Sequence, residues 1–131
     1  MRRYLTLLLP ILLMTSVAAV AADQGRSNLF LIFFQPWSAK LDAGNQKMIQ
    51  TAVTKAKTIP QSQVTVLGYA DMEGSAKANL DLTKSRVDAV KQMLVRDGFP
   101  EDRITVKPFG SVKPIGDSQE SRRVEITIRA P

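Results

Sequence analysis

One stretch, residues 64–94, constrains the fold more than any other part of this chain. Its first residues are apolar and β-branched, which favours a strand, and this strand ends next to an acid, Asp71. The turn-forming residues 72–75 follow. The stretch therefore predicts a strand that leads through a tight turn into a helix. On the helix, apolar residues recur at amphipathic intervals of three and four, at Leu80, Thr83, Val87, Val90 and Leu94.

Arg86 interrupts the apolar side of this helix. It lies one turn from both Leu82 and Val90, on the flank of the apolar stripe. A guanidinium held against a core needs an anion nearby or a water-filled cleft. The nearest candidate anion in the stretch is Asp71, at the end of the preceding strand. A cation and an anion fixed at one edge of a sheet suit a small ligand that carries both charges.

The beginning of the chain differs in kind from the rest. Arg2 and Arg3 precede an almost wholly apolar run over 5–17, and small residues that suit a signal peptidase follow it. We predict a signal peptide over 1–22, cleaved after Ala21 or after Ala22, and one domain over 23–131. The alternative is an uncleaved membrane anchor, but the apolar run is shorter than the ~20 residues that a spanning helix needs.

Charge and composition exclude several classes of function. Without residues 1–22 the net charge falls from +6 to +4, which does not argue for a nucleic-acid partner; an exported protein meets anionic lipids and cell-wall polymers instead. The chain has no cysteine and no histidine. It therefore has no disulfide, no thiolate nucleophile, no cysteine for a lipid anchor, and neither of the commonest zinc ligands. We expect an exported, soluble domain with no cofactor or metal.

Hydrophobic periodicity predicts six elements after the signal. The run over 29–34 is apolar on both faces and looks like a central strand. Strands are also predicted over 63–70, 103–107 and 122–129, helices over 42–57 and 75–97, and a loop over 108–121. Asp42 suits a helix N-cap, and Met48, Ile49, Ala52, Val53 and Ala56 are the predicted buried face of the first helix. This order predicts a two-layer α/β domain, with two helices on one face of a mixed four-stranded sheet.

A set of motifs resembles one protein family. With Phe33, Phe34 and Leu41 near the start, they place the resemblance over about 29–129. The motifs are Gly68-Tyr69-Ala70-Asp71, Gly74-Ser75, Asn79 with Leu82, Thr83, Arg86, Val87, Val90 and Leu94, Gly98-Phe99-Pro100, Phe109-Gly110 with Lys113-Pro114, and Ser121-Arg122-Arg123-Val124-Glu125-Ile126. The asparagine–leucine–arginine spacing on a helix, followed by a double arginine, is their specific part. In these motifs the chain resembles the OmpA-like C-terminal domain, the peptidoglycan-binding module of outer-membrane proteins and peptidoglycan-associated lipoproteins, here in a stand-alone exported form.

The resemblance implies binding of diaminopimelate, the cross-linking residue of the cell-wall stem peptide. It implies that Arg86 holds the ligand's carboxylate, in a forked contact, and Asp71 its ammonium. Asn79 would add amide hydrogen bonds, and Arg122 or Arg123 would line the same cleft, since strand alternation lets only one of the two face it. The implied location is the periplasm, in association with the cell wall and outer membrane. Peptidoglycan is the implied partner, and outer-membrane or other envelope proteins stay open as further partners.

The chain departs from the family pattern at three places. Tyr69-Ala70 stands where the family usually has histidine and threonine, and Ser121 stands in place of an asparagine. Gln35-Pro36-Trp37 replaces acidic residues after the first strand. That wall of the pocket must therefore bind differently, either by apolar contact from Trp37 or with Trp37 as a core or lid aromatic.

Simpler interpretations stand beside each site assignment. Asp71 and Arg86 could form a structural ion pair, Asn79 could be a local cap, and Arg122 and Arg123 could lie on a solvated strand face next to Glu120.

Three functions from different classes are considered. We favour non-catalytic peptidoglycan binding, with an envelope interaction or assembly protein without wall binding as the alternative. A cell-wall hydrolase is disfavoured, because histidine and cysteine are absent and Asp71 and Glu73, two residues apart in a turn, are a poor glycosidase pair. We expect no enzymatic activity.

Overall fold

The computed structural model describes residues 28–112 and 118–131. The predicted signal peptide, 1–22, and its cleavage site lie outside these ranges. The longer elements are β1 (Leu29–Phe33), α1 (Ala43–Lys57), β2 (Gln63–Ala70), α2 (Ala76–Arg96), β3 (Ile104–Ser111) and β4 (Arg123–Arg129). A 3₁₀ turn, Glu101–Arg103, precedes β3, and a short helix α3, Ser118–Ser121, precedes β4.

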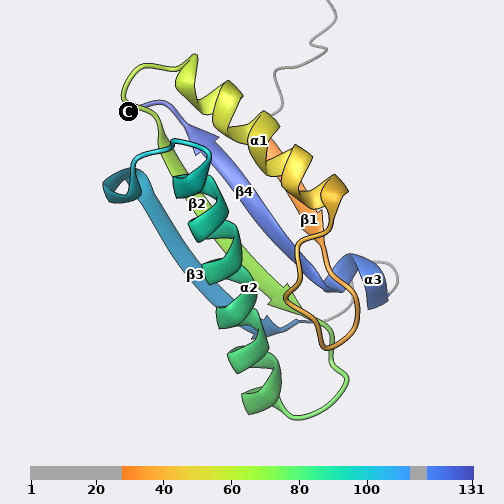
Figure 1. Ribbon diagram of the computed structural model, residues 1–131. Coiled ribbons are helices and arrows are strands. Elements are labelled where there is room, and N and C mark those ends of the chain that lie inside the picture. The colour runs from red at the N-terminus through yellow and green to blue at the C-terminus, as the bar shows by residue number, and fades with distance from the viewer. Residues whose placement is uncertain (1–27, 113–117) are drawn as a thin grey trace, which may run out of the picture.

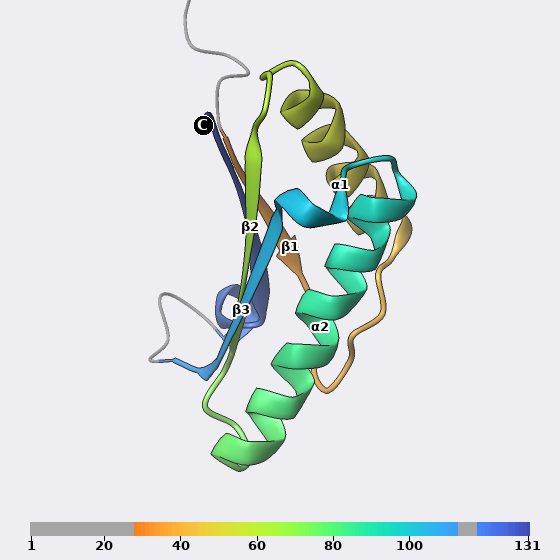
Figure 2. The same ribbon diagram turned by 90° about the vertical axis from the view of Figure 1, so that its left-hand side faces the viewer.

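The four strands form one mixed sheet in the order β1-β4-β2-β3. β2 and β3 are parallel, and β4 is antiparallel to both of its neighbours, β1 and β2. Both long helices cross the same face of this sheet (Figure 1), and the view at right angles shows them on one side of it (Figure 2). The predicted two-layer α/β fold class, with its strand and helix order, is confirmed. We call the other side of the sheet the open face.

Two predictions about strands are wrong. β1 is an edge strand and not a central one, because only β4 pairs with it. Its apolar run reflects two different faces: Ile32 is fully buried under the helices, whereas the side chains on the open face stay 37–45% exposed, at Leu29, Leu31 and Phe33. The third strand continues to Ser111 and so includes the first part of the loop predicted over 108–121. Pro108 lies inside β3, and an edge strand tolerates the missing N–H.

The helices begin where the sequence predicts. The Asp42 carboxylate accepts a hydrogen bond from Asn45 N at 2.7 Å, and Ser75 Oγ accepts one from Ala78 N at 3.1 Å. The predicted face of α1 is buried except for Met48, which is 41% exposed. Within residues 28–112 and 118–131, no helix is both long and apolar enough to cross a membrane.

Helix α2 lies directly against β2 because Gly68 has no side chain. A Cβ at Gly68 would lie 2.5 Å from Val87 Cγ1 and 2.6 Å from Thr83 Cγ2. These are closer than real carbon atoms approach, so only glycine fits here without rearrangement. The contact brings the first half of α2 beside the C-terminal end of β2, where the candidate site lies.

Candidate functional site

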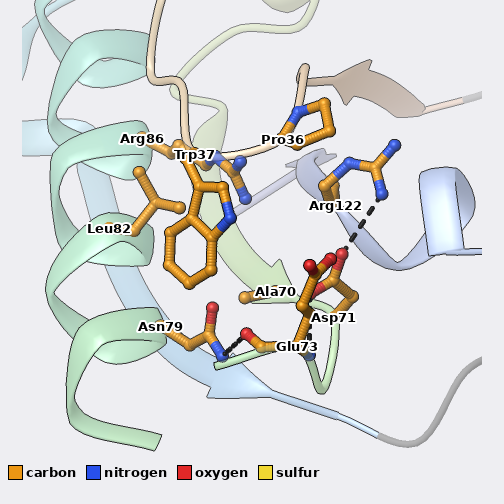
Figure 3. A pocket seen from close by; sticks show the side chains of 9 residues that line it. All are labelled: Pro36, Trp37, Ala70, Asp71, Glu73, Asn79, Leu82, Arg86 and Arg122. Carbon is orange, nitrogen blue, oxygen red and sulfur yellow. Dashed lines mark hydrogen bonds and ion pairs between the residues drawn. The ribbon is translucent and has the colours of Figure 1, made fainter. Parts of the chain in front are cut away.

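A pocket lies where the end of β2 meets the first half of α2 (Figure 3). Its walls come from four separate parts of the sequence: the loop after β1, the end of β2 with the turn that follows, helix α2, and the residue before β4. Two carboxylates, two guanidinium groups and one carboxamide are among the lining side chains, so the charges balance in number. The nine lining residues are Pro36, Trp37, Ala70, Asp71, Glu73, Asn79, Leu82, Arg86 and Arg122.

Arg86 is fully buried and anchors the loop after β1. Its Nε donates to the carbonyl oxygen of Ser38 at 2.8 Å, and its Nη2 donates to that of Gln35 at 3.0 Å. The guanidinium also lies over the Phe34 ring, 5.0 Å from the ring centroid. Nη1 is buried and has no hydrogen-bond partner among the residues that the structure describes. One end of this cation is therefore held by the protein, and the other end lacks an acceptor.

Burial also changes the protonation equilibrium of Arg86. Loss of solvent lowers the pKa of Arg86 to about 10, well below its ordinary value; Arg122 acts in the same direction and Asp71 opposes it. At neutral pH the group still carries its charge. A buried cation whose hydrogen-bond donors are only partly satisfied gains strongly from an added anion, so this site favours a carboxylate or a similar group.

Asp71 pairs with Arg122 and not with Arg86. Its Oδ2 lies 3.1 Å from Arg122 Nη1, and its Oδ1 accepts a hydrogen bond from Glu73 N at 3.0 Å. Arg122 Nε donates further to the carbonyl oxygen of Phe34 at 3.2 Å. The sequence suggested a structural ion pair between Asp71 and Arg86, but in the structure the cation that pairs with Asp71 is Arg122. The carboxylate stays at the pocket wall, where Asp71 is 8% exposed.

Asn79 fixes the turn that carries both acids. Its Nδ2 donates to the carbonyl oxygen of Glu73 at 2.7 Å, across the gap between α2 and the turn. The side chain is 2% exposed and lies in the first turn of α2. Its amide hydrogen bond therefore shapes the pocket from within.

Arg123 lies on the open face, away from the pocket. Its guanidinium lies over the Tyr69 ring, 4.3 Å from the centroid, and its Nε donates to Glu125 Oε1 at 2.9 Å. Nη1 donates to the carbonyl oxygen of Glu120 at 3.1 Å. The structure thus brings Asp71, Asn79, Arg86 and Arg122 together and leaves Arg123 out, because adjacent residues of an extended chain face opposite ways.

Sequence reasoning missed part of the pocket. Glu73 was considered only as half of an acid pair, and Leu82, although part of the family motifs, was given no role in the site. Every residue has a main-chain carbonyl group, so the sequence could not indicate which two carbonyl oxygen atoms bind Arg86. Within the described residues, no group of three or more histidine, cysteine, aspartate or glutamate side chains is placed to hold a metal ion.

Fold and site together define a small two-layer α/β domain with a charge-balanced pocket at a strand–helix junction. The chain belongs to the OmpA family, whose sequence model matches residues 33–126. The family predicted from the motifs is thereby confirmed.

Three relatives are similar to this chain over part of its length. The peptidoglycan-binding protein ArfA of Mycobacterium tuberculosis is 32% identical over 96 residues, which is 69% of this chain and 29% of ArfA. The peptidoglycan-associated lipoprotein of Agrobacterium fabrum is 31% identical over 84 residues, 64% of this chain and 48% of the lipoprotein. Outer membrane porin F of Pseudomonas fluorescens is 36% identical over 77 residues, 54% of this chain and 24% of the porin. The chain spans between about a quarter and a half of these relatives.

Solved structures share the fold. The peptidoglycan-associated lipoprotein from Burkholderia pseudomallei superposes with a TM-score of 0.70 at 23% identity, over 76% of this chain and 90% of that one. The OmpA-like domain of FopA1 from Francisella tularensis gives 0.67 at 24% identity, over 79% and 72%. At this identity the likeness establishes the architecture, while the ligand has to be argued from the site.

Proposed function

We propose that this domain binds peptidoglycan without cleaving it, and that it holds the diaminopimelate of the stem peptide. One observation carries the proposal: the buried Arg86 cation has an unpartnered Nη1 in a pocket that also contains two carboxylates. The printed names of two relatives, a peptidoglycan-binding protein and a peptidoglycan-associated lipoprotein, support the same ligand class.

The arrangement suits the amino-acid end of diaminopimelate, which carries an ammonium and a carboxylate on one carbon atom. Because Nε and Nη2 of Arg86 already donate to loop carbonyls, the ligand's carboxylate meets the Nη1 end of the guanidinium. The ammonium meets the carboxylates of Asp71 and Glu73 on the opposite wall. Arg122 neutralises Asp71 while no ligand is bound and then shares it with the ammonium.

The positions of the acids support binding over hydrolysis. A glycosidase needs two carboxyl groups on either side of the bond that it cleaves. Here Asp71 and Glu73 come from one turn, and a guanidinium lies 3.1 Å from the first. Neither acid is therefore placed as one of a flanking pair.

The second candidate is an envelope interaction or assembly protein that keeps the fold without binding the wall. The exposed apolar side chains of β1 on the open face favour it, because a protein partner could bury them. In either case we propose that residues 1–22 direct export to the periplasm and are removed. N-terminal sequencing of the exported protein would then begin at Ala22 or Asp23.

Retention on purified sacculi tests the proposal. We expect Asp71→Ala to weaken retention by about tenfold or more, because it removes one partner of the ammonium. Asp81→Ala is the matched control, since Asp81 lies on the exposed side of α2, outside the pocket lining, and pairs with Lys77 at 2.7 Å. It should leave retention unchanged.

Each other outcome points to a different function. No retention of the unaltered protein supports the interaction protein, and released muropeptides support a hydrolase. Equal retention of both variants contradicts the site assignment, provided that circular dichroism shows both to be folded.

A further inference from the structure

The indole of Trp37 occupies the middle of the pocket. Figure 3 shows it with Leu82 and Asn79 of α2 on one side and the acid-bearing turn on the other. The side chain is nevertheless 53% exposed, so much of its surface faces solvent. Trp37 is therefore a lining residue whose side chain is about half exposed.

The far edge of the indole rests on Gly74. A Cβ built there would lie 2.5 Å from Trp37 Cη2 and 3.0 Å from Cζ2, which no real side chain could occupy. Gly74 also has φ of +86°, in the left-handed region that glycine favours. The indole thus bridges the loop after β1 and the turn after β2, and it fits because residue 74 has no side chain.

The backbone at Trp37 is itself strained. Its φ is 52°, and among the described residues only Gln61, at 58°, shares a positive φ without being glycine. For a bulky residue this conformation costs energy and persists only where its surroundings impose it. Here the turn is closed by a hydrogen bond from Ser38 N to the carbonyl oxygen of Gln35, at 3.2 Å, and the Arg86 guanidinium binds the carbonyls at both of its ends.

We propose that Trp37 is a movable cover of the pocket, which must swing aside before a ligand carboxylate can reach Arg86 Nη1. The inference rests on the proposed function and adds a conformational step to it. Nη1 has essentially no exposed surface, so no ligand reaches it while the pocket keeps this arrangement. Among the lining side chains, Trp37 combines a half-exposed ring with a strained backbone, and its displacement costs less than moving α2 or the sheet.

A covered site has a lowered apparent affinity, because only the open fraction of molecules can bind. Removing the cover should therefore tighten binding. Trp37→Gly does this and at the same time relieves the positive φ. Gln61→Gly is the matched control, since it relieves the same backbone conformation in the loop between α1 and β2, away from the pocket.

Trp37 is the single tryptophan of the chain, so its fluorescence reports the cover directly. We suggest titrating the full exported protein with meso-diaminopimelate while following both heat and tryptophan emission. Binding should shift the emission and increase quenching by acrylamide. Trp37→Gly should bind at least about threefold more tightly than the unaltered protein, and Gln61→Gly should bind like it.

The outcomes separate the cover from the function. Binding with unchanged emission and quenching overturns the cover, and so does weaker or equal binding by a folded Trp37→Gly. Binding by Trp37→Gly alone supports a cover that is nearly always closed. Absence of heat in every variant overturns the diaminopimelate site itself, and the cover with it.

Discussion

Arg122 and Arg123 are neighbours in the chain, yet they lie in two regions of opposite character. On the open face, Arg123 has a carboxylate, a carbonyl oxygen and an aromatic ring around it. On the helix-covered side, Arg122 pairs with Asp71, while Arg86 binds main-chain carbonyl oxygen atoms and keeps a buried nitrogen without a partner among the described residues. Buried polar groups are nearly always satisfied in native proteins, so an exception needs an explanation. The comparison shows that the polar groups named on the open face are paired, whereas the covered side keeps one unpaired donor, which is the basis of the ligand site that we propose.

The two regions also differ in how tightly they are packed. On the covered side, α2 approaches β2 so closely that Gly68 leaves no room for a methyl group. On the open face, large side chains such as Phe109, 53% exposed, project from the sheet. Substitutions should therefore cost most on the side that forms the pocket.

The largest effect is expected from Gly68→Ala. The added methyl group would meet two β-branched side chains that have little freedom to move, so we expect a loss of about 3 kcal/mol in the free energy of unfolding. Gly44→Ala is the control, because a Cβ there meets only Asp42 Oδ1, at 3.3 Å. Urea unfolding measures both. Equal stabilities would show that the close approach is not what fixes α2.

Two substitutions of Arg86 should separate stability from binding. Arg86→Ala leaves a cavity and should cost about 2 kcal/mol, whereas Arg86→Met fills the space and should stay within about 1 kcal/mol of the unaltered protein. Because burial lowers the pKa of Arg86 to about 10, the buried charge costs stability at every pH below about 10. That cost is relieved only as the pH rises above about 10, and methionine removes it altogether.

Neither Arg86 variant should be retained on sacculi. Retention of Arg86→Met would show that the guanidinium does not contact the ligand. A methionine variant as unstable as the alanine variant would show instead that the hydrogen bonds to the loop carbonyls dominate its stability.

The smallest effects are expected from alanine substitutions of Arg122 and Arg123, which compare the two neighbouring arginines directly. Arg122→Ala should weaken sacculus retention by about tenfold, because it disturbs the carboxylate that meets the ammonium. Arg123→Ala should change retention less than about twofold, since it lies on the open face. Pull-downs at several protein concentrations distinguish these values. If the two variants behave alike, the pocket and the open face do not differ in function.

Much of the fold could be predicted because its signals are local. The spacing of apolar residues indicated both long helices, and Asp42 indicated where the first one begins. The family motifs added the placement of Asp71, Asn79, Arg86 and Arg122, which the structure gathers in one pocket. These features depend on residues close in sequence or on a pattern shared by the family.

What could not be predicted depends on contacts between distant parts of the chain. Arg86 binds main-chain oxygen atoms 48 and 51 positions away, and any residue type supplies such atoms. The edge position of β1 depends on pairing with β4, which no local pattern reveals. The left-handed backbone of Trp37 follows from the anchored loop and not from the residue, because tryptophan does not favour it.

The order of the strands in the sheet affects how the chain can fold. β4 follows the other three strands of this sheet along the chain, yet it lies between β1 and β2. The unit β2–α2–β3 can assemble from nearby segments, whereas β1 has no partner within the described sheet until β4 is present. Docking of β1 is thus a late, long-range step of folding. A chain that stops short of Arg122 would lose the strand that joins its two halves, along with one wall of the binding pocket.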